Sequence, residues 1–210
     1  MGGITRFRCE FPSRAQKPVP LTIPNNSLST QHLKQVWPDL SWNHTSSFNC
    51  GKQHAKTIIC ILDALKIGKT ARIIDIGAHD NALIEEIRKV GFINSFGIDS
   101  KPIILGSKYG FQANFRDVPF DEKFHLIHFG ALLDYFRGGN FNFNGSPTLE
   151  LFAWKLGLHL VPNGFLIFHD FAENYDAFCR ELKRNGFEFI CELLPPSDNI
   201  HHYAIWRKAN

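Results

Sequence analysis

The stretch from Ala71 to Asp99 constrains the fold of this chain more than any other. It begins with a short, mainly β-branched run at Ile73–Ile76, which is typical of a buried strand in a parallel sheet. Apolar residues at helical spacing follow and end at a glycine, so the next segment is predicted to be an amphipathic helix. A second short strand is predicted at Ser95–Ile98. The stretch therefore predicts a strand–helix–strand unit with parallel strands.

The ends of these two strands have residues suited to binding a ligand. Gly77 directly follows the first strand, and a glycine there allows a ligand to approach the backbone closely. The helix that follows presents free N–H groups at its start. Asp99 ends the second strand 99 − 77 = 22 residues later, close to the spacing at which an acid accepts hydrogen bonds from a ribose diol. The pattern favours a nucleotide site, and a parallel unit of the same shape without a ligand is the alternative.

The rest of the chain continues the alternation of strands and helices. Further strands are predicted at 111–115, 124–129, 165–168, 187–193 and 201–207, and helices at 53–67, 146–160 and 173–184. The last two strands are joined by Pro195–Asn199, which is too short for a parallel crossover, so they are predicted to be antiparallel neighbours. The predicted fold class is α/β, with a doubly wound, mostly parallel seven-stranded sheet and a C-terminal antiparallel strand pair.

Two parts of the chain differ in pattern. Residues 1–50 lack sustained periodicity and are interrupted by five prolines, with one short helix predicted at Ser29–Gln35. We expect this N-terminal extension to act partly as a lid over the ligand site, because its aromatic residues need a partner. Residues 51–210 are predicted to form the α/β domain.

The composition argues against several classes of protein. A length of 210 residues suits a single domain, and a net charge of +3 does not indicate a nucleic-acid partner. The five cysteines are scattered without a Cys-x-x-Cys pair, so we predict no zinc knuckle and expect free thiols in a reducing compartment. There is no apolar run long enough to span a membrane and no secretory leader, so the predicted location is cytoplasmic.

The order of the motifs resembles that of the class I S-adenosylmethionine-dependent methyltransferases, over about residues 53–208. A Pro-Asn-Gly turn before the fifth strand, at Pro162–Gly164, also matches this family. The resemblance implies a Rossmann-like methyltransferase domain, S-adenosyl-L-methionine as cofactor, and cofactor contacts at the ends of the first four strands. The contacts it implies are Asp75, Gly77, Ala78 and His79 after the first strand, Asp99 and Ser100 after the second, Asp117 and Val118 after the third, and Phe129 and Gly130 after the fourth.

Three positions depart from the family pattern, which usually has Gly-x-Gly-x-Gly in the first turn. His79 and Asn81 stand at the second and third glycines. A Cβ at position 79 narrows the room for the methionine carboxylate, whereas asparagine tolerates a left-handed backbone. His125 stands where an aspartate is common in the fourth strand. A catalytically degenerate, methyltransferase-like binding or regulatory protein is therefore one alternative to an enzyme.

An NAD(P)-dependent oxidoreductase is the other alternative, because the first strand–helix–strand unit suits either cofactor. The terminal strand pair and Asp117 favour the methyl donor.

Catalytic groups are expected at the carboxyl ends of the strands, where ligands bind in such sheets. His169 and Asp170 end the fifth strand and are the predicted catalytic pair. His169 can act as a general base near neutral pH, and Asp170 resembles the acid that holds Mg²⁺ in some small-molecule O-methyltransferases. His169 or Asp170 can instead cap the following helix. For His128, a structural role is preferred to a catalytic one.

The methyl acceptor is predicted to be a small molecule. No Asn-Pro-Pro-Tyr type signature for methylation of amino nitrogen follows the fourth strand, where Phe129–Leu132 stands. This favours an oxygen atom as the acceptor.

Overall fold

The computed structural model describes residues 50–101, 108–133, 149–170, 172–193 and 202–210. Its strands are β1 (Ile73–Ile76), β2 (Ser95–Asp99), β3 (Gly110–Gln112), β4 (Phe124–Gly130), β5 (Leu160–Asp170), β6 (Phe187–Leu193) and β7 (His202–Lys208). Its helices are α2 (Cys50–Ala64), α3 (Ala82–Lys89), α4 (Leu149–His159), α5 (Ala172–Arg184) and the short 3-10 helix η3 (Phe115–Asp117).

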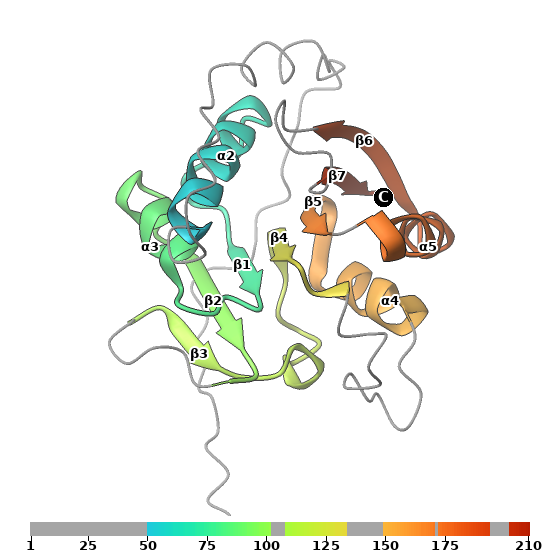
Figure 1. The fold of residues 1–210 in the computed structure, drawn as a ribbon, viewed down its shortest axis with the longest axis horizontal. Coiled ribbons are helices and arrows are strands. Elements are labelled where there is room, and N and C mark those ends of the chain that lie inside the picture. The colour runs from blue at the N-terminus through green and yellow to red at the C-terminus, as the bar shows by residue number, and fades with distance from the viewer. Residues whose placement is uncertain (1–49, 102–107, 134–148, 171, 194–201) are drawn as a thin grey trace, which may run out of the picture.

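The strands form one sheet in the order β3-β2-β1-β4-β5-β7-β6 (Figure 1). The strands from β1 to β5 pair in parallel, whereas β7 is antiparallel to both β5 and β6. The predicted seven-stranded, mostly parallel sheet with a C-terminal antiparallel pair is therefore confirmed. Because the chain crosses from β3 to the far side of β1, the strand order reverses between β1 and β4.

Alternate strand residues face two separate cores, as the two-residue period of a strand requires. Ile73 and Leu126 lie in the core with residues of α2 and α3. Their chain neighbours Ile74 and Ile127 lie in the core with residues of α4 and α5. Both faces of the sheet are buried, which explains why the central strands are nearly continuous apolar runs.

The predicted turn at Pro162–Gly164 does not separate a helix from a strand. Strand β5 begins at Leu160, directly after α4, so the predicted start of this strand was too late. The pairing of β4 with β5 shifts register between Phe124 and Leu126, and Asn163 has a φ of 60°. The Pro-Asn-Gly segment therefore forms a bulge within the strand. The other predicted elements differ from the observed ones by a few residues at their ends.

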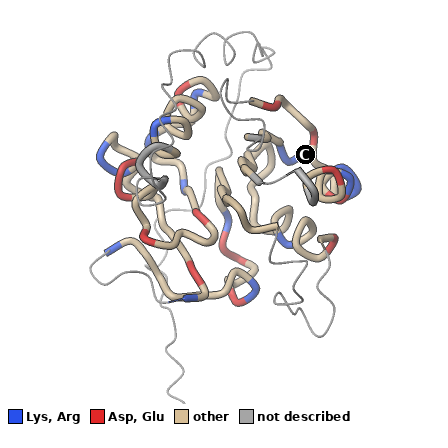
Figure 2. Tube along the Cα trace, viewed as in Figure 1, with Lys and Arg blue, Asp and Glu red and all other residues tan. Residues whose placement is uncertain are grey.

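Several predictions fall outside the described residues. They are the lid formed by residues 1–50, of which only Cys50 is described, the helix at Ser29–Gln35 and the start of a helix at residue 146. Within the described ranges, no helix combines the length and apolarity needed to cross a membrane. Charged residues there lie mainly on the outer helices and near the ends of the strands (Figure 2).

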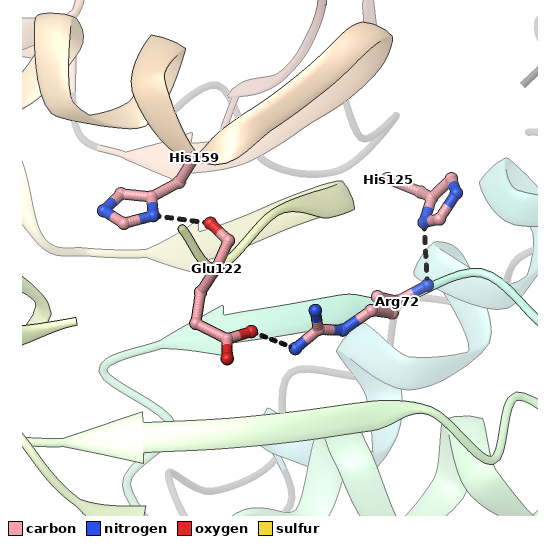
Figure 3. Close-up of polar contacts among 4 residues, drawn as sticks. All are labelled: Arg72, Glu122, His125 and His159. Carbon is pink, nitrogen blue, oxygen red and sulfur yellow. Dashed lines mark hydrogen bonds and ion pairs between the residues drawn. The ribbon is translucent and has the colours of Figure 1, made fainter. Parts of the chain in front are cut away.

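Polar contacts fasten β1, β4 and α4 together at the amino edge of the sheet (Figure 3). The backbone N–H of Arg72 donates to Nδ1 of His125 at 3.0 Å, so this histidine acts as an acceptor where the family commonly has an aspartate. The Arg72 guanidinium pairs with Glu122, and Nδ1 of His159 donates to the Glu122 carbonyl at 2.9 Å. These contacts fix the three elements at the edge opposite the predicted site.

Burial lowers the pKa of His159 from its ordinary value of 6.5. The ring is fully buried against Phe115, Phe120 and Phe124. Below about pH 6.5 the unfolded chain therefore binds a proton that the folded chain resists. The stability that neutral His159 contributes is complete above that pH and is lost as the pH falls.

We expect the free energy of unfolding to fall less between about pH 7.5 and about pH 5 in His159→Asn than in the wild type. Asparagine can donate to the Glu122 carbonyl but does not titrate. Urea denaturation at both pH values measures the difference between the two proteins. An equal loss of stability in both would contradict the assignment.

Candidate functional site

A cavity of about 260 Å³ opens at the carboxyl ends of β1, β2 and β4. It spans the point where the strand order reverses, which is where open α/β sheets bind ligands. Its lining comes from the turn after β1, the end of β2, the segment after β3 and the end of β4. The lining residues are Ile76, Gly77, His79, Ile98, Asp99, Ser100, Lys101, Ala113, Asn114, Phe115, Gly130, Ala131 and Leu132.

The turn after β1 adopts a left-handed backbone at alternate positions. The φ angle is 77° at Gly77, 49° at His79 and 61° at Asn81. The two residues that replace glycines therefore keep a conformation that glycine favours. The N–H groups of Gly77 and Ala78 donate to the Ile98 carbonyl at 2.8 and 3.0 Å, which holds the turn against the end of β2. The side chain of His79 is exposed at the cavity.

Asn81 packs against β2 and does not line the cavity. Its side chain is fully buried, and a Cβ built on Gly97 would lie 1.9 Å from its Oδ1. The glycine in β2 therefore makes room for this asparagine. Asp80, its neighbour, accepts a hydrogen bond from the N–H of Ala82 at 3.0 Å and so caps the start of α3.

The carboxylate of Asp99 is fixed at the cavity by two backbone groups. Its Oδ2 accepts from the N–H of His79 at 3.0 Å, and its Oδ1 accepts from the N–H of Lys101 at 2.8 Å. Each oxygen keeps further acceptor capacity, and the residue is only half-buried. A carboxylate held in this way can accept hydrogen bonds from two adjacent hydroxyl groups.

The segment after β3 contributes Asn114 and Phe115 to the cavity, and not the predicted Asp117. The carboxylate of Asp117 is mainly exposed and lies 3.4 Å from Nε of Arg116. Lys155 of α4 fixes this segment, because its ammonium donates to the Arg116 carbonyl. Burial lowers the pKa of Lys155, and the Asp117 charge partly opposes this effect.

Five polar side chains lie together on the α2 face of the sheet, and we call them the imidazole cluster: His54, Asp75, His128, His169 and Tyr203. Nδ1 of His128 donates to Oδ1 of Asp75 at 2.7 Å, between adjacent strands. The ring of His169 stacks with those of His128 and His54, at centroid distances of 5.6 and 4.3 Å. The Tyr203 ring lies 5.0 Å from that of His169, and its hydroxyl contacts Nδ1 of His54.

Gly130 connects the cluster to the cavity. It lines the cavity, and a Cβ built on it would lie 1.9 Å from Cε1 and 2.4 Å from Nε2 of His169. The imidazole therefore packs directly on the backbone at the end of β4. The N–H of Ala131 donates to the His169 carbonyl at 2.9 Å, which joins the two strand ends.

The structure divides the predicted site residues into groups. Those that line the cavity are Gly77, His79, Asp99, Ser100 and Gly130. Those that do not line it are the buried Asp75, Ala78, Val118 and Phe129 and the exposed Asp117. Asp75 and His169 belong to the imidazole cluster, and the side chain of Asp170 is outside the described part of the chain.

Sequence analysis missed His54 and Tyr203. Both come from elements far from the glycine turn, at the start of the α/β domain and near its end. One signal was present, because His54 lies four residues before Ile58 on the apolar face of α2.

The described residues give no support to the predicted magnesium site. Among them, no group of three His, Cys, Asp or Glu side chains is arranged to hold a metal ion.

Solved structures with a similar fold include methyltransferases that act on different acceptors. The N-methyltransferase NodS from Bradyrhizobium japonicum WM9, in complex with S-adenosyl-L-homocysteine, matches with a TM-score of 0.60 at 13% identity, over 85% of this chain and 100% of that chain. Magnesium protoporphyrin IX methyltransferase from Synechocystis PCC 6803 matches with a TM-score of 0.55 at 11% identity, over 86% of this chain and 92% of that chain. The chain has the fold of the S-adenosylmethionine-dependent methyltransferases.

The ribosomal protein L11 methylase from Lactobacillus delbrueckii subsp. bulgaricus shares this methyltransferase fold, with a TM-score of 0.55 at 16% identity, over 80% of this chain and 90% of that chain. The sequence matches no protein-family model and no curated protein. The likeness is therefore one of fold.

We expect Gly130→Ala to destabilise this methyltransferase fold by about 1–3 kcal/mol, because the new Cβ displaces the buried ring of His169. Gly68→Ala is the matched control, since no atom lies within 4 Å of a Cβ built there. Urea denaturation of both variants measures the effect. Similar stabilities would show that His169 does not pack on Gly130 in solution.

Proposed function

We propose that this chain is an S-adenosylmethionine-dependent methyltransferase. The observation that carries the proposal is the cavity across the carboxyl ends of β1, β2 and β4, with the Asp99 carboxylate fixed in its wall. The fold supports the proposal, because it is shared with methyltransferases such as NodS.

The cavity residues fit the parts of this cofactor. Gly77 lines the cavity with a φ of 77°, a conformation that favours a residue without a Cβ, so the methionine part can approach the backbone there. Asp99 accepts hydrogen bonds from the ribose hydroxyls, and the apolar side chains of Ile98 and Phe115 enclose the adenine. Asp117 is proposed to meet the adenine amino group, which requires its exposed carboxylate to turn toward the cavity. When bound, the cofactor supplies a methyl group already activated by its sulfonium, so this chain has to orient the acceptor and take its proton.

We expect Asp99→Ala to weaken the binding of S-adenosylmethionine by about 1.5–3 kcal/mol, the range for losing a hydrogen bond to a charged group. Asp80→Ala is the matched control. It also removes a carboxylate that accepts a backbone N–H in this turn, but Asp80 does not line the cavity. Isothermal titration with S-adenosylmethionine and with NAD measures both effects.

An unchanged affinity in Asp99→Ala would refute the ribose assignment. Binding of NAD in preference to S-adenosylmethionine would instead favour the oxidoreductase alternative.

We infer that the acceptor is a small molecule methylated on oxygen. The sequence Phe129–Leu132 at the end of β4, which lacks the signature for amino-nitrogen methylation, supports this acceptor. A hydroxyl group has to lose its proton, and the imidazole of His169 lies beside Gly130 at the cavity. His169 is therefore the proposed general base, with Asp170 as the second proposed catalytic residue.

A protein that binds the cofactor without catalysis is the second candidate. His79 favours it, because an imidazole stands at the cavity where the family usually has glycine.

A screen of alcohols, phenols, carboxylic acids and amines with methyl-tritiated S-adenosylmethionine separates the two candidates. We expect transfer of label to hydroxyl-bearing acceptors, with the rate in His169→Gln reduced by about 10²–10⁴-fold and cofactor binding retained. Binding of the cofactor without transfer to any acceptor would favour the second candidate.

A further inference from the structure

None of the five side chains of the imidazole cluster lines the cavity. The cluster lies beside it on the α2 face of the sheet, where the ring of His169 packs on the cavity-lining Gly130. Asp75 and His128 follow Ile73 and Leu126 by two residues, so they point to the same face as these core residues. On this face β1 and β4 therefore change from apolar to polar side chains toward their carboxyl ends. We propose that the cluster is the proton-accepting wall of the methyl-acceptor site, where His169 contacts the acceptor and the other four side chains position it. This inference rests on the proposed methyltransferase function.

Asp75 and His128 form the inner part of the cluster. They are 5% and 3% exposed, respectively. Since the carboxylate accepts the Nδ1 proton of His128, the Nε2 atom of this ring is an acceptor in the neutral form. This Nε2 is buried and has no hydrogen-bond partner among the described residues, which is uncommon in folded proteins. A carboxylate–imidazole pair in this state can stabilise positive charge that arrives beside it.

His54 and Tyr203 form the outer part of the cluster and hold the ring of His169. The rings of His54 and His169 are stacked at 19°, and the fully buried Tyr203 bonds to His54 through its hydroxyl. His54 is half-buried, so the cluster is partly exposed at this residue, whereas His169 is buried. The titratable side chains whose rings lie against His169 are His54, His128 and Tyr203, and Asp75 is bonded to His128.

The proposed transfer moves one positive charge into the cluster. A lone pair of the acceptor oxygen forms the new bond to the methyl carbon while the carbon–sulfur bond breaks and leaves its electron pair on sulfur. The acceptor proton passes to the imidazole of His169. The charge that was on the sulfonium is then on the imidazolium, where Asp75 and His128 stabilise it. In this proposal the acceptor meets the ring beside Gly130, the cavity-lining residue on which His169 packs and where a side chain would collide with the imidazole.

Proton release on binding tests the proposal without a known acceptor. S-adenosylmethionine has a sulfonium charge that S-adenosylhomocysteine lacks, and a cation beside the cluster disfavours imidazolium. Titration calorimetry in two buffers of different ionisation enthalpy counts the protons released by each ligand. The sulfonium charge shifts the imidazoles of the cluster toward the neutral form, and the protons that they lose pass to the buffer. We expect S-adenosylmethionine to release more protons per bound ligand than S-adenosylhomocysteine.

Three variants locate the source of the protons. His169→Gln and His128→Asn should each reduce the difference between the two ligands by half or more, and the asparagine keeps a donor for Asp75. His159→Asn is the matched control, because it removes a buried imidazole at the opposite edge of the sheet and should leave the difference unchanged. The affinity for S-adenosylhomocysteine reports whether the cavity of each variant is intact.

Equal proton release by the two ligands in the wild type would refute the proposal, as would an unchanged difference in His169→Gln. Failure to bind either ligand would instead refute the proposed function, so the two failures are distinguishable.

Discussion

The parallel pairing of β1 with both β2 and β4 is the constraint on which the rest of the structure depends. In this register, Ile76 lies opposite Ile98 on one side and Phe129 on the other. The residues that follow these three strand positions therefore reach the same edge, where Asp99 and Gly130 meet the turn after β1. A slip of one residue would reverse the faces of the strand and separate these groups.

The two faces of the central strands carry different kinds of side chain near their carboxyl ends. On the α4 face, apolar side chains continue to the carboxyl ends and enclose the cavity. On the α2 face, the last positions are polar and contact one another in the imidazole cluster. Burying such groups is costly unless they are paired. The pairing of Asp75 with His128 offsets that cost and leaves a polar surface next to the cavity.

The two edges of the sheet separate stability from the proposed chemistry. At the amino edge, the contacts of Arg72, Glu122 and His159 join β1, β4 and α4. None of these three residues lines the cavity, and the ring of His159 lies 5.2 Å from that of Phe115, which does line it. At the carboxyl edge, the turn and strand ends hold polar groups that a ligand can reach. Buried histidines occur at both edges, and their surroundings distinguish them. Phenylalanine rings enclose His159, whereas His169 lies among other titratable side chains.

By itself, the sequence determined the elements of the fold and one part of the site. The run at Ile73–Ile76, the glycine after it and the spacing to Asp99 were enough to predict parallel strands and an acid at the cavity, because these features are local. The bulge at Pro162–Gly164 was not predictable, since its three residues form a turn signal that only pairing with β4 converts into a strand.

Only the tertiary structure determined which residues of different strands and helices contact one another. It moved Asp75 from the predicted cofactor contacts to the imidazole cluster, and it joined His54 to Tyr203 across 149 residues of chain. Local periodicity shows which face of a strand a residue is on, but not which strand lies beside it. That neighbour follows from the order of strands in the sheet, which is set by packing over the whole domain.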